Sequence, residues 1–135
     1  MEFFVGYGQR EITPPMGVEL SGYGYFLQRR CDAVQDPLYA RAVAFRQQDN
    51  TQLIINCDLL GLGPWMVDAV RGALNQWYGL SAEQVLLLSI HTHTGPTTGG
   101  LPGCGDDSRL AHSGGGTGVG GPFSGGGDEN RRLAD

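Results

Sequence analysis

The chain contains no lysine, and all nine of its basic residues are arginine. A Schiff-base lysine and a phosphate-binding loop of the Gly-Lys-Ser/Thr type are therefore excluded within these 135 residues. Charge of both signs is modest, with 14 acidic residues, a net charge of −5 and no basic stripe. This composition argues against nucleic acid or an anionic membrane surface as the main partner.

Cysteine is scarce as well, and Cys31, Cys57 and Cys104 form neither a C-x-x-C pair nor a small disulfide framework. They are typical of reduced thiols in a cytosolic protein. The N-terminus lacks the cationic segment and long apolar stretch of a signal peptide, and no run approaches the ~20 apolar residues of a transmembrane helix. We therefore expect a soluble, cytoplasmic product without a transmembrane segment.

The length suits one domain with a real core and is too short for two. Glycine dominates the C-terminal end: more than half of the 23 glycines lie at or after Gly95. Residues 106–135 carry hardly an apolar side chain to bury, so we expect a disordered Gly-rich tail there. Residues 1–105 would then form the folded part.

Apolar runs bounded by Gly, Pro and polar residues predict five strands, at 3–8, 20–25, 38–46, 51–57 and 85–90. The third and fourth strands flank the polar residues 47–50, which favours an antiparallel hairpin. Gly22 and Gly24 suggest a loop that passes close to another group, but a packed aromatic hairpin is the favoured explanation for these residues taken alone.

A helix is predicted over 64–78, because Pro64 suits a first helical position and apolar residues from Met66 to Trp77 recur on one face. Strand 51–57, this helix and strand 85–90 form a β-α-β unit, which predicts parallel strands with a right-handed crossover. The last strand is apolar at consecutive positions and is therefore expected to be buried on both faces. The fold class predicted is α/β with a mixed sheet.

Two of the three histidines, His91 and His93, follow the last strand directly. On an extended chain, residues two apart point to the same side, so both imidazoles can face one cavity at the carboxyl end of the sheet. They could hold one metal together, or one could bind the metal while the other meets the substrate. They could equally be polar residues of a surface turn. Asp58 emerges at the same edge and is a candidate acceptor that fixes the tautomer of His91, or else it caps the following turn.

Two further features of the tail carry no prediction of a site. Residues 116–121 satisfy G-x-G-x-x-G, but they follow no strand and open no helix, so glycine density explains the match. His112 would be a third metal ligand only at a large ordering cost, and we expect it to be incidental.

Six short motifs follow one another along the chain: Val5-Gly6-Tyr7-Gly8, Glu11-Ile12-Thr13-Pro14-Pro15, Ser21-Gly22-Tyr23, Asp36-Pro37-Leu38-Tyr39-Ala40-Arg41-Ala42, Asn56-Cys57-Asp58-Leu59 and Ser89-Ile90-His91-Thr92-His93-Thr94-Gly95-Pro96. With these motifs the chain resembles the N-terminal part of the neutral/alkaline non-lysosomal ceramidase family, whose order and spacing it matches over about residues 4–105. Ile90 stands where ceramidases proper tend to carry Thr, which is closer to the bacterial relatives.

This resemblance implies a zinc-dependent amidohydrolase that cleaves the N-acyl bond of ceramide or a similar lipid amide. His91 maps onto a zinc-ligating histidine, and His93 onto the neighbouring histidine that contacts the substrate or its oxyanion. Family members are considerably longer and take their remaining ligands, another His, a Glu and a Tyr, from downstream segments that this sequence does not contain. The resemblance therefore implies a fragment that is inactive alone.

The similarity to the family fades just after residue 106, where a Gly- and Arg-rich composition begins. We hypothesise that the tail is read out of frame from a GC-rich gene. A truncated paralogue is the alternative. In either case, the sheet should expose edges and an apolar face that other segments normally cover.

Overall fold

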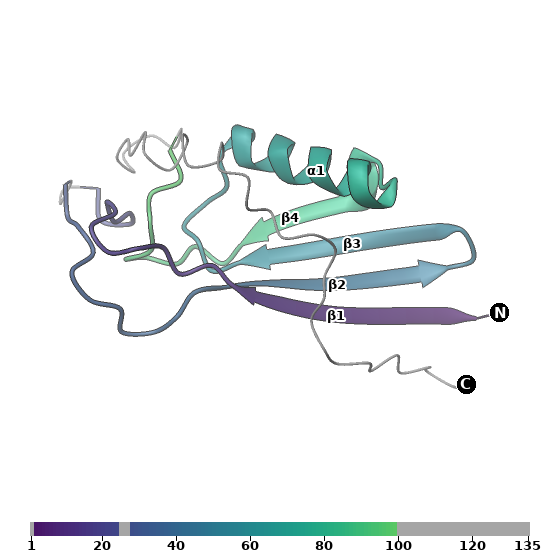
Figure 1. Ribbon diagram of the computed structural model, residues 1–135, viewed down its shortest axis with the longest axis horizontal. Helices are drawn as coiled ribbons and strands as arrows, with labels where there is room; N and C mark the ends of the chain where they lie inside the picture. Colours follow the sequence, from purple (N-terminus) through teal and green to yellow (C-terminus); the bar gives the residue numbers. More distant parts are fainter. Residues whose placement is uncertain (1, 25–27, 100–135) are drawn as a thin grey trace.

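The computed structural model of the chain describes residues 2–24 and 28–99. Within this part the chain forms a four-stranded sheet with an α-helix against one face (Figure 1). In chain order the elements are β1 (Phe3–Glu11), β2 (Tyr39–Gln47), β3 (Asn50–Cys57), α1 (Pro64–Tyr78), the 3-10 turn η1 (Ala82–Gln84) and β4 (Val85–Ser89). The strands are ordered β1-β2-β3-β4, and only the β3–β4 pair is parallel. The predicted α/β class with a mixed sheet is confirmed.

The antiparallel hairpin of β2 and β3 is tighter than the sequence indicates. Gln47 pairs with Asn50, so only two residues make the turn, and the first of them, Gln48, has a φ of +52°. A two-residue turn with positive φ matches the right-handed twist of the flanking strands. The hairpin is confirmed, and each strand gains a residue at the turn.

The β-α-β unit places the carboxyl ends of β3 and β4 side by side. Helix α1 begins with Pro64, whose missing N–H would have no helical partner at this position. It ends at Gly79, which has a φ of +69° and donates its N–H to the Asn75 carbonyl at 2.9 Å. Pairs from Leu53–Val85 to Cys57–Ser89 then run in parallel. Both the helix bounds and the parallel pairing agree with the prediction.

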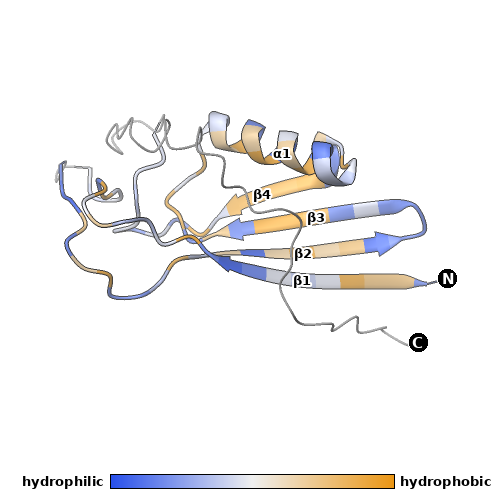
Figure 2. Ribbon diagram, viewed as in Figure 1, coloured by the Kyte–Doolittle hydropathy of each residue, from blue (hydrophilic) through white to orange (hydrophobic). Residues whose placement is uncertain are grey.

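The two faces of the sheet differ in their cover. On the face beneath α1, Val85 is only 2% exposed. On the other face, Leu86 and Leu88 are 50% and 42% exposed, and Ile90 beyond the strand is 57% exposed. The expectation that this strand is buried on both faces is therefore wrong for the described residues, because α1 covers one face and no described element covers the other (Figures 1 and 2). The sheet thus exposes an apolar face within the described residues, as expected from the sequence.

The strand predicted at 20–25 does not form in the part of it that the structure describes. Glu19 and Leu20 make only isolated bridges, to Arg30 and Pro96. Gly22, with a φ of +106°, turns the chain out of the extended conformation. Strand β1 instead runs three residues further than predicted, because β2 offers partners as far as Tyr39.

Two predictions on the tail lie outside the described residues: its disorder over 106–135 and the incidental role of His112. In the described part, α1 has 15 residues, and no helix there is long and apolar enough to cross a bilayer.

The uncovered face of β4 predicts self-association of the purified chain. Exposed apolar strands at a sheet edge are templates for pairing with another copy. The double substitution Leu86→Lys, Leu88→Lys should lower the fraction of dimers and larger species in sedimentation velocity across a concentration series. Trp77→Lys is the matched control, because Trp77 is 44% exposed but lies on α1. A wild-type chain that stays monomeric at all concentrations would contradict the prediction.

Candidate functional site

The two histidines lie in a turn that continues the pairing of β3 with β4. Beyond the strands, Ile90 donates its N–H to the Cys57 carbonyl at 3.2 Å, and Thr92 donates to the Leu59 carbonyl at 3.0 Å. These bonds hold the segment after β4 against the segment after β3. His91 and His93 therefore stand at the carboxyl end of the parallel pair, the edge where open α/β sheets form their sites.

His91 is not on an extended chain, as the sequence argument assumed. Strand β4 ends at Ser89, and His91 has a φ of +62°, a left-handed conformation that non-glycine residues adopt at a cost of about 1–2 kcal/mol. The imidazoles of His91 and His93 nevertheless lie close together, with ring centroids 5.0 Å apart and an interplanar angle of 63°. The assumption of an extended chain is therefore wrong, and it is a turn that brings the two rings together.

The ring of His91 has a defined neighbour. Its Nδ1 lies 3.1 Å from the Leu60 carbonyl oxygen, an acceptor that favours the tautomer with the proton on Nδ1. Nε2 is then the nitrogen with a lone pair available to a cation. The main-chain acceptor comes from the loop after β3, so the β-α-β topology itself supplies the orientation.

His93 is held between an aromatic ring and a glycine. The Tyr23 ring meets it edge-on, with centroids 5.0 Å apart and an interplanar angle of 90°. A Cβ built on Gly22 would lie 2.7 Å from Cγ and 2.9 Å from Cα of His93, so only glycine fits. The inference from the sequence that this loop passes close to another group is correct for Gly22.

Ser21 fastens that loop to the histidine turn. It is 2% exposed, and its N–H donates to the Gly95 carbonyl at 2.9 Å while its own carbonyl accepts the N–H of Thr94 at 3.0 Å. Its Oγ donates to the Gly95 carbonyl at 3.2 Å. Sequence analysis did not assign Ser21 a role, because its partners lie more than 70 residues away.

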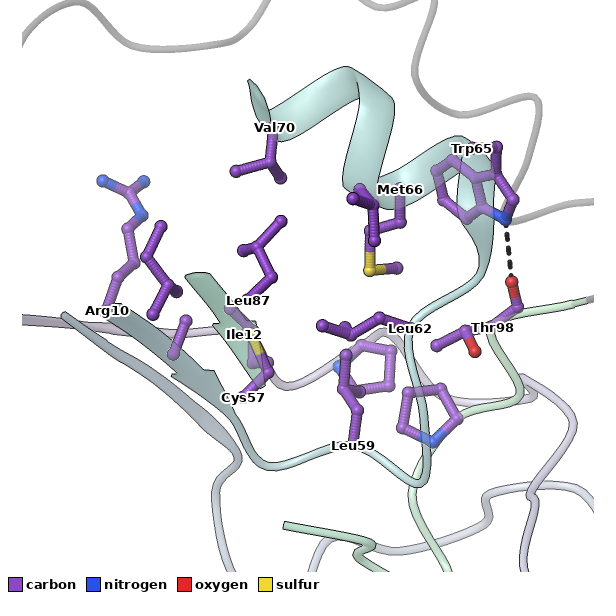
Figure 3. A pocket seen from close by; sticks show the side chains of 15 residues that line it. Arg10, Ile12, Cys57, Leu59, Leu62, Trp65, Met66, Val70, Leu87 and Thr98 are labelled. Atoms are coloured by element: carbon purple, nitrogen blue, oxygen red, sulfur yellow. Dashed lines mark hydrogen bonds between the residues drawn. The ribbon is translucent and has the colours of Figure 1, made fainter. Parts of the chain in front are cut away.

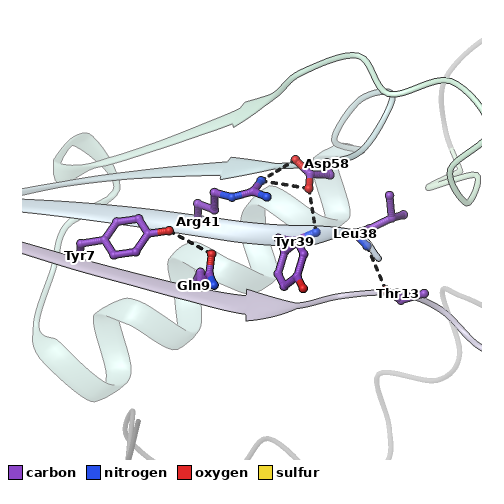
Figure 4. A network of polar contacts seen from close by, with 7 residues as sticks. All are labelled: Tyr7, Gln9, Thr13, Leu38, Tyr39, Arg41 and Asp58. Atoms are coloured by element: carbon purple, nitrogen blue, oxygen red, sulfur yellow. Dashed lines mark hydrogen bonds and ion pairs between the residues drawn. The ribbon is translucent and has the colours of Figure 1, made fainter. Parts of the chain in front are cut away.

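Asp58 is engaged away from the histidines. Its carboxylate accepts hydrogen bonds from the Arg41 guanidinium at 2.8 and 3.0 Å and from the Tyr39 N–H at 2.9 Å (Figure 4). The carboxylate therefore ties the start of β2 to the end of β3, whereas the acceptor beside Nδ1 of His91 is Leu60. The role of Asp58 as a partner of His91 stays a prediction without a contact in its favour.

Cys57 is unsuited to act as a ligand or nucleophile. Burial, and secondarily the negative charge of Asp58, raises the pKa of its thiol. The thiol therefore stays protonated at neutral pH, and a neutral thiol is a poor nucleophile and metal ligand.

A metal site in the described residues would rest on the two imidazoles. No group of three or more His, Cys, Asp or Glu side chains suited to one metal occurs within 2–24 and 28–99. Zinc sites use three or four protein ligands, so the donor types fit zinc but their number falls short. A cavity of about 580 Å³ opens beside His93 and is lined also by Thr92, Asp32 and Asp36.

Comparison with solved structures confirms the resemblance stated from the sequence. The fold is similar to the crystal structure of neutral ceramidase from Pseudomonas aeruginosa, with 25% identity and a TM-score of 0.64 over 71% of this chain. A ceramidase complexed with C2 gives the same values. The chain covers only 16% of the length of either protein. No family model and no curated protein matches the sequence.

The contact between Gly22 and His93 can be tested with a matched pair of glycines. Gly22→Ala and Gly17→Ala both place a side chain at positive φ, at a cost of about 1–2 kcal/mol, but a Cβ on Gly17 meets nothing within 4 Å. Only Gly22→Ala should also shift the His93 ring resonances in a proton–nitrogen correlation spectrum. If the His93 ring resonances were the same in both variants, the Cβ at residue 22 would be accommodated without moving the His93 ring, and the prediction would be wrong.

The Asp58 contacts predict a loss of stability that an exposed carboxylate would not cause. Asp58→Ala removes the acceptor of Arg41 and of the Tyr39 N–H, so the free energy of unfolding should fall by about 1–3 kcal/mol in urea denaturation. Asp68→Ala, on the exposed side of α1, should change it by less than about 0.5 kcal/mol. Equal effects of the two substitutions would argue against a structural role for Asp58.

Proposed function

We propose that the chain is part of a zinc-dependent amidohydrolase that cleaves the N-acyl bond of ceramide or a similar lipid amide, and that it is inactive alone. The observation that supports this most is the similarity to neutral ceramidase over 71% of this chain, in a fold that brings the two histidines together. A ceramidase-related fragment follows from that similarity. The zinc dependence, the substrate and the lack of activity are the parts we propose.

In this proposal His91 is a zinc ligand. Its Nδ1 faces the Leu60 carbonyl, which leaves Nε2 for the metal and fixes the plane of the ring. When bound, zinc would lower the pKa of a water molecule towards ~7 and polarise the amide carbonyl. The left-handed backbone at His91 would keep the ring turned towards His93.

His93 would act on the substrate. It would stay unliganded and either donate a hydrogen bond to the developing oxyanion or protonate the leaving amine. Its ring is confined by Tyr23 and by the close approach of Gly22, so it needs little reorganisation before it donates. The polar cavity beside it gives an amide group room to approach.

The lack of activity follows from the number of ligands. With His93 unliganded, His91 is the one imidazole ligand that the described residues supply, whereas catalytic zinc sites use three protein ligands and one open position. The family resemblance assigns the missing ligands to segments downstream of this sequence. The chain alone should therefore bind zinc weakly and turn over no substrate.

Zinc titration and an amidase assay on the purified chain test this. We expect weak zinc binding that is lost in His91→Ala and largely kept in His93→Ala, with no hydrolysis of a fluorogenic N-acyl amide by any of the three proteins. Hydrolysis by the wild-type chain that His91→Ala abolishes would contradict the fragment proposal. No zinc binding at micromolar metal would favour a non-catalytic product.

A chimera tests the catalytic role directly. The part of this chain that superposes on the Pseudomonas neutral ceramidase would replace the matching segment of that enzyme, and ceramide hydrolysis would be measured. Loss of an outer-shell partner alone costs metal sites roughly 10–100-fold, so His91→Ala in an active chimera should cost more than about 100-fold. An active chimera that tolerates His91→Ala would remove His91 from the site.

A further inference from the structure

A second cavity, of about 420 Å³, lies between α1 and the sheet (Figure 3). Its floor is the α1-facing side of the sheet, with Ala40 from β2, Ile55 and Cys57 from β3 and Leu87 from β4. Its volume falls in the range of ligand pockets, roughly 300–1,000 Å³. The lining is almost entirely carbon, so the pocket suits an apolar occupant.

The walls of this apolar pocket come from three separate segments. Met66 and Val70 of α1 form its roof, and Leu59 and Leu62 of the loop after β3 form one side. The Trp65 indole N–H donates to the Thr98 carbonyl at 2.9 Å and closes one end (Figure 3).

Arg10 provides the charge in the lining of the pocket. It projects from β1 on the side that α1 faces, and Figure 3 places it at the end away from Trp65. It pairs in register with Ala40, so its neighbour on β2 is a small side chain of the apolar floor. Arg10 is exposed, and its guanidinium makes no side-chain hydrogen bond or ion pair within the residues that the structure describes.

We propose that the apolar pocket binds the alkyl chain of a long-chain carboxylate, with the carboxylate paired to Arg10 at the open end. The apolar lining selects a hydrocarbon chain, because each buried methylene contributes up to about 0.8 kcal/mol. The single guanidinium selects a monoanion, which it can bind in bidentate fashion. A neutral alcohol of the same length would fill the pocket but leave Arg10 without a partner.

The pocket is separate from the histidine site. Neither His91 nor His93 lines it, and it shares only Pro14 and Pro96 with the cavity beside His93. The inference therefore does not depend on the proposed function. Binding should persist without metal and in the His91→Ala variant.

Calorimetric titration of the full 135-residue chain with dodecanoate, below its micelle concentration, tests the proposal. Affinity should rise from octanoate through decanoate to dodecanoate, by up to about fourfold per methylene, and dodecanol should bind more weakly than dodecanoate. Arg10→Gln should weaken dodecanoate about three- to tenfold and leave dodecanol unchanged. Arg46→Gln is the matched control: Arg46 lies at the far end of the same sheet face over the Phe4 ring and should have no effect.

The thiols supply a second readout. Cys57 lines the pocket and Cys31 does not, so in alkaline buffer that ionises the Cys57 thiol, bound dodecanoate should slow alkylation of Cys57 relative to Cys31 in a Cys104→Ser background. The proposal is overturned if dodecanoate does not bind, if Arg10→Gln leaves its affinity unchanged, or if Cys57 gains no protection. It is also overturned if a second copy of the chain occupies the pocket, which would make binding fall as protein concentration rises.

Discussion

The parallel pairing of β3 with β4 is the constraint on which the rest of the structure depends. It carries on past the strands through the bonds from Ile90 to Cys57 and from Thr92 to Leu59, so two loops distant in sequence leave the sheet together. The first loop supplies the Leu60 carbonyl and the second supplies His91. The orientation of the imidazole is thus a property of the backbone topology and does not need a charged partner.

Two cavities with different linings lie next to each other at this edge of the sheet. On one side of Pro14 and Pro96 lies a polar cavity with His93, and on the other lies a cavity of carbon atoms with Arg10 at its open end. Small residues on β1 and β2 make this possible, since Gly6, Gly8, Ala40 and Ala42 carry little or no side chain on the face of the sheet that α1 packs against. Larger side chains there would fill the space that the apolar pocket occupies.

Sequence reasoning succeeded where the signals were local. The bounds of the helix from Pro64 to Tyr78 are predicted by residues at its own ends, a proline at the first position and a glycine after the last. The hairpin and the β-α-β unit likewise follow from short spacings. The strand predicted at 20–25 failed because Gly22 turns to accommodate His93, a contact between residues 71 apart that no local pattern reveals. Burial of β4 on both faces failed because periodicity reports how apolar a strand is, and not whether another element covers it.

The long connection between β1 and β2 also has a consequence for how the chain folds. The hairpin of β2 and β3 closes over two residues, whereas β1 must be joined to β2 across residues 12–38. Closing a longer loop costs more conformational entropy before the contacts form. We therefore expect β1 to pair with β2 more slowly than β2 and β3 form their hairpin. Arg10 and the Ser21 clamp both lie at or beyond the end of β1. The segment that completes each cavity is therefore expected to join the β2–β3 hairpin after that hairpin has formed.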